Sequence, residues 1–280
     1  MIQNIKSVLI GITKEFGPDE SSSALAYGLS LAQQADAHAT VLAASVKLTL
    51  SAAGLSRTVA GLVRAENTRL QALVETIARN AEADAAAAGV ICTTQTPHIP
   101  ASELLSAFSL QARLHDITVL DSEISVINLD RGLFETLLTQ SGRPILVVPP
   151  ERRSFSCGRI ILAWDGSAKA ARAASDALPF MRAAEAVEVI CVTGEKPLPD
   201  AVGGTDIAPH LARHGVNVTV DTIAAHKGDV AGALRSAAAN FEADILVMGG
   251  YVHSRMREML LGGVTQSLLR DSAVPLMISY

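Results

Sequence analysis

The sequence predicts an α/β fold with two tandem doubly wound domains, each built around a five-stranded parallel sheet in a Rossmann-like plan. Three observations lead to this fold class. Short apolar runs alternate with helix-period patterns along the chain, and such alternation is typical of a parallel sheet covered by helices on both faces. The alternation occurs twice, and a cluster of proline and charged residues at 149–153 separates the two copies.

The two copies align strand by strand. Apolar runs at residues 6–13, 115–120 and 144–148 match runs at 158–165, 243–248 and 275–279. A proline, Pro144 or Pro275, introduces the last strand of each copy. Because internal repetition decides how many domains a chain contains, we expect one domain at residues 1–150 and a second at 155–280.

Helix-period apolar faces fill the segments between these strands. The first copy carries them at residues 24–35, 59–88 and 133–141, and the second at 170–181, 207–214 and 264–271. Gly89 and Gly215 follow two of these helices as C-terminal stops, before strands expected at 90–96 and 216–223. A further strand is expected at 187–193. We expect each copy to read β-α-β-α-β-α-β-α-β, which includes a further helix before the fourth strand.

The composition narrows the class of function. With 280 residues, of which 49% are hydrophobic and 18% charged, the chain can bury a large core. Its net charge of −5 and scattered basic residues predict no binding to nucleic acid or an anionic membrane. The apolar run at residues 8–12 is too short for a signal peptide or a membrane span. We therefore expect a cytoplasmic protein whose partners are small molecules or other proteins.

A ligand site is expected in the second copy. Ligands of doubly wound sheets bind beyond the carboxyl ends of the strands, where the strand order reverses, here between the first and fourth strands. The first strand ends at Asp165, and glycine pairs, Gly249-Gly250 and Gly262-Gly263, bracket the loop after the fourth. Such glycines leave the amides of the next helix bare for an anion. The alternative is that they are simple turn residues.

The loop between the glycine pairs resembles the signature of the universal stress protein family. In that signature glycine, two residues, glycine, nine residues, glycine and then serine or threonine surround the phosphates of a nucleotide. Here the frame runs through Gly249, Val252, Gly262 and Gly263. Val252 replaces a glycine and Gly263 replaces the hydroxyl residue, although Thr265 lies two positions on. Because backbone amides make much of the contact in such cradles, the substitutions weaken the nucleotide hypothesis without removing it.

The resemblance implies an adenine-nucleotide-binding fold that holds ATP, ADP or AMP together with Mg²⁺. It assigns Asp165 to the ribose or base and Val192 to the adenine; for Asp165 a turn or helix N-cap role is the alternative. It further implies that the terminal strands of the two copies pair, giving an intramolecular pseudo-dimer that could also associate as a homodimer. The implied binding residues are Ala163, Asp165, Val192, Met248, Gly249, Val252, His253, Gly262, Gly263, Val264 and Thr265.

The first copy keeps the strands but lacks the residues of the site. Thr13 stands at the position of Asp165, and Asp121 stands at that of Gly249. A carboxylate there would repel a polyphosphate. Of the second glycine pair only Gly132 remains. We expect this copy to be architectural, with a degenerate site.

Three functions are compatible with the sequence. The leading hypothesis is a stress-response protein that binds an adenine nucleotide and acts through conformation or association with protein partners. The second is a ligand-free interaction scaffold, favoured by Val252 and Gly263. The third is a slow ATP hydrolase, for which no catalytic residue is identified because no positioned general base is found. His210 and His214 lie four residues apart but lack a glutamate and a third ligand, so no metal site is predicted.

Overall fold

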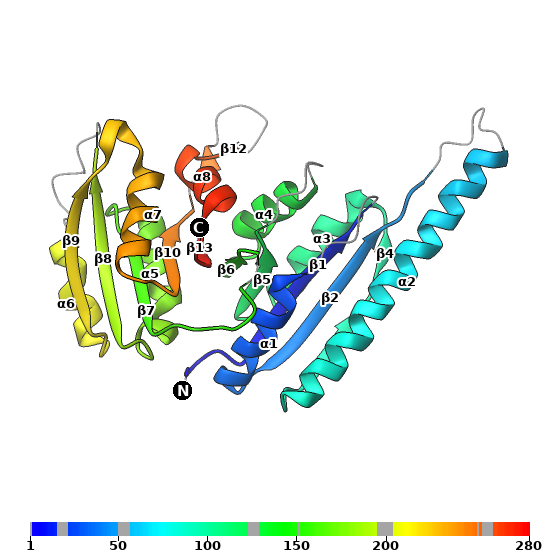
Figure 1. Cartoon of the computed structure of the whole chain (residues 1–280), viewed down its shortest axis with the longest axis horizontal. Coiled ribbons are helices and arrows are strands. Elements are labelled where there is room, and N and C mark those ends of the chain that lie inside the picture. Colours follow the sequence, from blue (N-terminus) through cyan, green and yellow to red (C-terminus); the bar gives the residue numbers. More distant parts are fainter. Residues whose placement is uncertain are drawn as a thin grey trace.

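The computed structural model shows two α/β halves joined through one continuous sheet (Figure 1). We call the residues up to Pro150 the N-terminal half and those from Arg152 onward the C-terminal half. The structure describes residues 2–15, 22–49, 57–122, 129–150, 152–194, 204–250, 252–253 and 260–280.

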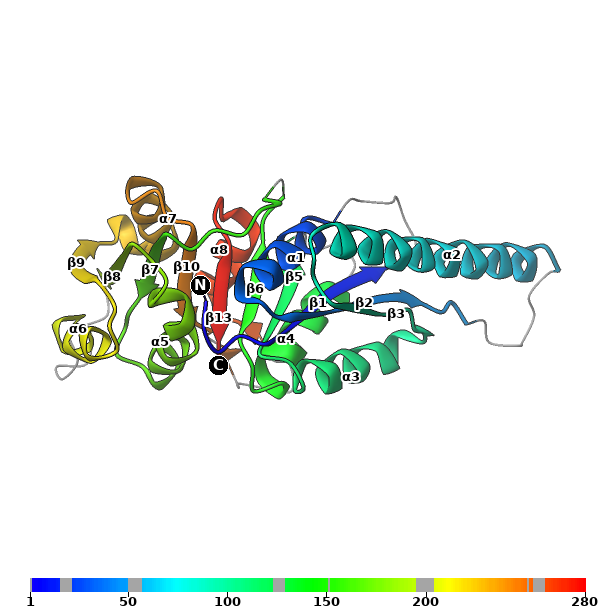
Figure 2. The same ribbon diagram turned by 90° about the horizontal axis from the view of Figure 1, so that it is seen from below.

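The N-terminal half follows the predicted alternation. Its elements are β1 (Ser7–Lys14), α1 (Ser23–Ala35), β2 (His38–Val46), α2 (Arg57–Ala87), β3 (Cys92–Gln95), β4 (His98–Ile99), α3 (Ala101–Ala112), β5 (Ile117–Asp121), α4 (Leu129–Gln140) and β6 (Ile145–Val148). The short strand β4, which pairs with β2, was not predicted. Figure 2 shows α2 running along β2 and β3 and past the ends of these strands.

The C-terminal half repeats the plan with one addition. Its elements are β7 (Arg159–Ala163), α5 (Ala168–Met181), β8 (Ala186–Thr193), α6 (Gly204–Arg213), β9 (Val218–Ala224), a 3₁₀ turn η1 (His226–Gly228), α7 (Val230–Asn240), β10 (Ile245–Gly249), β11 (Val252–His253), β12 (Leu260–Leu261), α8 (Gly263–Asp271) and β13 (Leu276–Ser279). The addition is the antiparallel pair β11–β12, which the sequence did not predict.

The strand order confirms the doubly wound topology and the pairing of the terminal strands. It runs β3-β2-β1-β5-β6 in the N-terminal half and β9-β8-β7-β10-β13 in the C-terminal half. In both, the order reverses between the first and fourth strands. Strands β6 and β13 pair antiparallel, with Ile145 opposite Ile278 and Val147 opposite Leu276. The two sheets therefore merge into one, which covers an edge strand of each half.

Equivalent side chains make equivalent bonds in the two halves. Asp116 accepts a hydrogen bond of 3.0 Å from the backbone N–H of Ser7, and Asp244 accepts one of 2.9 Å from that of Arg159. Each carboxylate thereby ties the start of the fourth strand to the start of the first. The strand register pairs Val8 with Ile117 and Ile160 with Ile245, so the repeat extends from the sequence to individual contacts.

Side-chain caps set the start of three helices. Ser22 caps α1 by accepting from the N–H of Leu25, and Ser167 caps α5 by accepting from that of Ala170. Asp229 caps α7 in the same way through Gly232. These bonds satisfy amides that a helix leaves unpaired at its first turn.

The core lies in two layers, one on each face of the sheet. Helices α1, α2, α5 and α6 cover one layer, which includes Tyr27, Val74 and Phe180. Helices α3, α4, α7 and α8 cover the other, which includes Phe108, Leu137 and Leu268. Both layers continue from one half into the other because the sheet does. Among the described residues, no helix combines the length and the apolar character needed to cross a membrane.

An aromatic side chain fixes the segment between the halves. Phe155 is only 2% exposed. Its ring packs edge-on against Tyr27 of α1 at 5.5 Å and at a tilt of 50° against Phe180 of α5 at 5.8 Å between ring centroids. Its backbone N–H donates to Ser30 Oγ, and its carbonyl accepts from Gln34 Nε2. The connecting segment is therefore clamped between the first helices of both halves.

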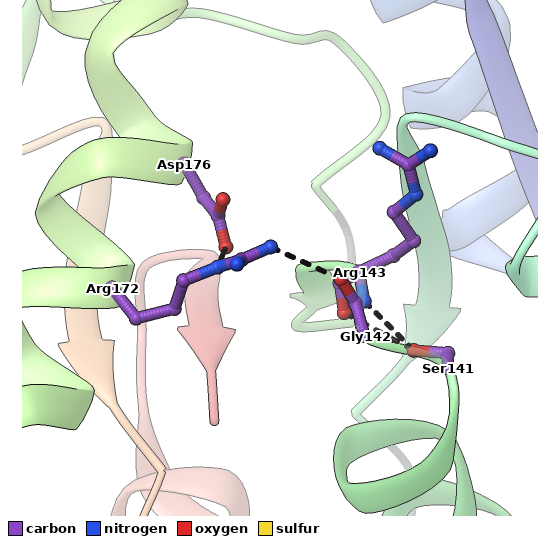
Figure 3. A network of polar contacts seen from close by, with 5 residues as sticks. All are labelled: Ser141, Gly142, Arg143, Arg172 and Asp176. Atoms are coloured by element: carbon purple, nitrogen blue, oxygen red, sulfur yellow. Dashed lines mark hydrogen bonds and ion pairs between the residues drawn. The ribbon is translucent and has the colours of Figure 1, made fainter.

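A polar contact also joins the two halves, between α5 and the turn after α4 (Figure 3). Arg172 of α5 donates to the carbonyl of Gly142 at 3.1 Å and to Asp176 at 2.9 Å. Gly142 has a φ of +67° and lies in the turn after α4, where the Ser141 hydroxyl bonds to the backbone of Arg143. The side chain of Arg172 is half exposed, so this contact adds less than the aromatic packing.

One glycine was assigned wrongly to a helix start. We expected Gly132 to precede the last helix of the N-terminal half, but α4 begins at Leu129 and places Gly132 in its first turns. The other predicted helix and strand bounds differ from the observed ones by a few residues, as fraying ends allow.

Candidate functional site

A cavity of about 200 Å³ lies at the carboxyl ends of the C-terminal strands, at the predicted reversal of strand order. Seven of the eleven residues expected from the sequence line it: Ala163, Asp165, Val192, Met248, Gly249, Val264 and Thr265. Seven further lining residues were not among those eleven: Trp164, Ser167, Lys169, Ile190, Val230, Leu234 and Gly250. The cavity therefore combines the ends of β7, β8 and β10 with the first turns of α5, α7 and α8.

Asp165 stands in the turn between β7 and α5. Its Oδ1 accepts a hydrogen bond of 2.9 Å from the N–H of Ser167, and Gly166 between them has a φ of +75°, which glycine adopts without strain. Ser167, not Asp165, is the N-cap of α5. Of the two local roles considered for Asp165, the structure shows the turn and excludes the cap. The second carboxylate oxygen of Asp165 has no hydrogen bond to a described residue of the chain.

Gly249 and Gly250 occupy positions where a side chain would collide. A Cβ at Gly249 would lie 2.7 Å from the backbone N of Ala170, in the first turn of α5. A Cβ at Gly250 would lie 2.7 Å from the side chain of Leu138, which belongs to α4 of the N-terminal half. Position 249 is therefore a glycine because its backbone lies too close to that of α5 to leave room for a side chain. Gly250 brings the edge of the cavity into contact with the other half.

The N-terminus of α8 receives no capping hydrogen bond from the side chain of its N-cap residue. Gly262 is its N-cap and offers no side-chain acceptor. Gly263 begins the helix, and a Cβ there would meet nothing within 4 Å. Neither glycine lines the cavity, but the next two residues, Val264 and Thr265, do. The predicted cradle therefore reaches the cavity through the second and third residues of α8, and Gly262 and Gly263 directly precede them in the chain.

Apolar side chains form one wall of the cavity. Ile190 and Val192 lie two residues apart on β8 and so face the same side of the sheet. Val230 and Leu234, four residues apart on α7, and Met248 of β10 complete the wall. Such a surface suits the flat face of an aromatic base.

Lys169 supplies a positive charge at the same cavity. Its Nζ lies 3.9 Å from the centroid of the Tyr280 ring, a distance at which a cation and an aromatic face attract. Lys169 comes from the first turn of α5. The sequence offered no pattern that singled out this lysine.

Some of the predicted residues cannot be judged from their side chains. Val252 and His253 form β11, which pairs with β12, but their side chains lie outside the described part of the chain. Arg255 and Arg257, two basic residues of the same loop, also fall outside it. The nucleotide contacts that the resemblance implies for Val252 and His253 therefore remain predictions.

In the N-terminal half, a carboxylate occupies the position that corresponds to Gly249. The register aligns Asp121 with Gly249, because they pair with Val148 and Ser279 at the ends of β6 and β13. Asp121 accepts hydrogen bonds of 2.6 Å from the Ser22 hydroxyl and 2.8 Å from the N–H of Ala24. Burial raises the pKa of Asp121 above its usual range, while these bonds oppose the rise. The carboxylate thus serves the N-terminus of α1.

Comparisons with known proteins agree with this geometry. Residues 157–279 match the model of the Universal stress protein family. Universal stress protein Slr1230 of Synechocystis is 23% identical over 149 residues, which make up 51% of this chain and 49% of that protein. The chain thus spans about half the length of the curated relative that it matches.

Solved structures share the fold of the whole chain. A universal stress protein from Archaeoglobus fulgidus aligns with a TM-score of 0.67 and 15% identity, covering 97% of this chain and 95% of its own. A protein of unknown function from Pseudomonas aeruginosa aligns with a TM-score of 0.54 and 15% identity, covering 99% and 92%. At these identities the likeness concerns the fold alone. Residues 157–279 thus match the universal stress protein family, and the similarity in sequence to that family rests on this part of the chain.

Proposed function

We propose that the C-terminal half binds an adenine nucleotide (ATP, ADP or AMP) in the cavity at the ends of β7, β8 and β10. The observation that carries the proposal is the convergence of three elements on one cavity. These elements are the carboxylate of Asp165, an apolar wall that includes Val192 and Met248, and the uncapped N-terminus of α8. A nucleotide offers a hydroxylated ribose, a flat base and an anion, and each finds a matching group here.

The lining suggests how the nucleotide would lie. The base would pack on the apolar wall, and Asp165 would accept hydrogen bonds from the ribose hydroxyls through the oxygen that does not bond to Ser167. The phosphates would face the amides at the start of α8, where the positive end of the helix dipole favours anions, and Lys169 would add a full charge. The volume of about 200 Å³ is below the range of about 300–1,000 Å³ for small-molecule sites, so the cavity would enclose the nucleoside and leave the phosphates at its rim.

Magnesium would accompany the phosphates. Within the described ranges, no group of three or more His, Cys, Asp or Glu side chains is placed to hold a metal ion. Mg²⁺ ordinarily keeps several waters and binds through substrate phosphates with one or two carboxylates. We therefore propose that any Mg²⁺ arrives with the nucleotide and neutralises part of its charge.

The contact between Gly250 and Leu138 supports an action through conformation or association. A ligand that moves the loop after β10 would press on α4 of the N-terminal half. We propose domains at residues 1–150 and 155–280, of which only the second binds nucleotide, and keep the stress response, the cytoplasmic location and a homodimer as predictions. The second candidate function is a ligand-free scaffold, which Val252 and Gly263 favour because both depart from the family's phosphate-binding pattern.

A thermal-shift titration with Mg²⁺ and ATP tests the proposal. A ligand that binds only the folded state stabilises it by about 2.7 kcal/mol at one hundred times its dissociation constant, so the unfolding midpoint should rise. Asp165→Ala should lose the rise. Thr13→Ala, the change at the equivalent position of the other half, is the matched control and should keep it. No rise at millimolar ATP would leave the scaffold as the better account.

A further inference from the structure

A second cavity of about 630 Å³ lies on the far side of α7, between this helix and strands β8 and β9. Ile190 is the one described residue that lines both this cavity and the proposed nucleotide site. Helix α7 separates the two, because Val230 and Leu234 face the first while Ala233 and Ala237 face the second. The volume falls within the range of about 300–1,000 Å³ that is typical of small-molecule sites.

The cavity exists because α7 carries small side chains where it passes over the sheet. Gly232, Ala233, Ser236 and Ala237 line its helical side. The corresponding helix of the N-terminal half, α3, carries Leu104 and Phe108, and both are fully buried between α3 and the sheet. The same place in the fold is thus filled in one half and hollow in the other.

The sheet side of the cavity also differs between the halves. Strand register aligns Glu188 with Thr40, because Val187 pairs with Ile160 as Ala39 pairs with Val8. Thr40 Oγ1 lies 2.9 Å from Nε2 of the buried His115. In the N-terminal half the polar side chain at this position is therefore hydrogen-bonded to an imidazole. At the position of His115 the C-terminal half has Ala243. Glu188 therefore brings an acceptor-only carboxylate to a place where the matching donor is missing.

The charges around the cavity favour a cation. Glu188 and Asp221 lie on the same sheet face of neighbouring strands, since Asp221 pairs with Ile190, and Asp229 adds a third carboxylate. His226 also lines the cavity, but in the part of the chain that the structure describes no lysine or arginine does. Burial and then the charge of Asp221 raise the pKa of Glu188, while the charge of Arg159, on β7, lowers it.

Arg159 does not fill the role of the missing cation. Its guanidinium donates to the carbonyl of Phe241 at 2.5 Å and lies 4.4 Å from the centre of that ring. It is thereby held against Phe241, at the end of α7, and it is not among the residues that line the cavity. The C-terminal end of α7, at Asn240, carries the negative end of the helix dipole and favours positive charge.

We propose that this cavity is a second binding site, and that it takes a small organic cation: an aliphatic amine whose ammonium group pairs with Glu188 and Asp221. Its methylene chain would lie on Ile190, Ile223 and Ala233. The site is independent of the nucleotide cavity and does not require that cavity to function.

Calorimetric titration of the full chain with hexamethylenediamine tests the proposal, with hexanediol as a neutral probe of the same chain length. The diamine should bind, more weakly as salt is added, and hexanediol should not. Glu188→Gln and Asp221→Asn should each weaken diamine binding about two- to fivefold. Ala233→Leu, which fills the cavity without changing charge, should weaken it about tenfold or more.

Two control variants separate this site from others. Glu103→Gln removes an exposed carboxylate of α3 and should leave diamine binding unchanged, as should Asp165→Ala in the nucleotide cavity. Unfolding curves of each variant identify any that fail to fold. If Ala233→Leu fails to fold, the Glu188 and Asp221 variants still test the proposal. Equal binding of hexanediol, unchanged binding in all three cavity variants, or no diamine binding at millimolar concentration would overturn the proposal.

Discussion

The hydroxyl of Ser22 donates a hydrogen bond of 2.6 Å to the carboxylate of Asp121, and this bond joins the first helix of the N-terminal half to the end of its fourth strand. The C-terminal half makes the same junction without a side chain. There Gly249 lies so close to α5 that a Cβ would be 2.7 Å from the backbone of Ala170. One half therefore uses a bonded carboxylate where the other uses bare backbone beside a cavity.

The carboxylate of Asp121 should give the stability a measurable pH dependence. Burial raises its pKa above the usual 3.8, so the folded state favours the protonated form. Relative to Asp121→Asn, the wild type should be most stable below the usual pKa, lose stability as the pH rises through the raised pKa, and then level off. Urea unfolding of both proteins between about pH 4 and 7 measures this difference. A wild-type advantage that grows with pH would contradict the assignment.

Gly249→Ala should destabilise the protein by about 1–3 kcal/mol, because the added methyl forces α5 away from β10. The matched control is Gly263→Ala, whose Cβ would meet nothing within 4 Å and which should change the free energy of unfolding by less than about 0.5 kcal/mol. Denaturant titration compares the two. Equal effects would mean that the close packing around Gly249 is not what selects glycine.

Phe155→Ala should cost about 3–5 kcal/mol, the usual loss for a buried phenylalanine, since its ring fills the space between Tyr27 and Phe180. Phe155→Leu keeps most of the apolar volume and should cost clearly less. Thermal and urea unfolding report both. A loss below about 1 kcal/mol for the alanine variant would show that the connecting segment does not clamp the halves.

Arg172→Met should cost less than about 1 kcal/mol, although it removes the hydrogen bond to Gly142 that crosses between the halves. The arginine is half exposed, and methionine retains the apolar stem. The same unfolding measurement ranks this polar contact against the Phe155 packing. A larger loss for Arg172→Met than for Phe155→Ala would reverse the order of the two contributions.

Gly263→Ser should tighten ATP binding if the family's phosphate cradle operates here. The site has room, because a Cβ at Gly263 meets nothing within 4 Å, and the hydroxyl would add one hydrogen bond worth about 0.5–1.5 kcal/mol, or about two- to tenfold in affinity. Titration with ATP and with adenosine separates the phosphate from the nucleoside. Improved binding of adenosine to the same degree would show that the hydroxyl does not act on the phosphates.

The sequence was enough to predict the architecture, because strands and helices of a doubly wound fold have distinct apolar periods. The repeat placed the first, fourth and fifth strands of both halves, and the strand order followed from known topology. The positions of Asp165 and Gly249 in the cavity followed as well, since Gly249 ends β10 and Asp165 lies in the turn after β7, at the reversal of strand order. The β11–β12 pair escaped prediction because its strands are only two residues long.

The remaining lining residues could not be predicted because they reach the cavity from elements without a motif. Val230 and Leu234 belong to a helix about 65 residues beyond Asp165 in the chain, and only packing brings them there. Ile190 was within reach, since it faces the same side of β8 as Val192. The hydrogen bonds of Asp121 could not be predicted either. The sequence shows that the residue carries a charge, but only the structure shows that its carboxylate accepts from the N-terminus of α1.

The central claim is that the chain has one nucleotide site, in its C-terminal half. Isothermal titration of the wild type with ATP and Mg²⁺ tests it most directly. The signal recorded is the emission of Trp164, which is the single tryptophan and lines the cavity. We predict one ATP bound per chain with a change in emission, both lost in Asp165→Ala. Two ATP molecules per chain, or binding that survives Asp165→Ala unchanged, would contradict the account.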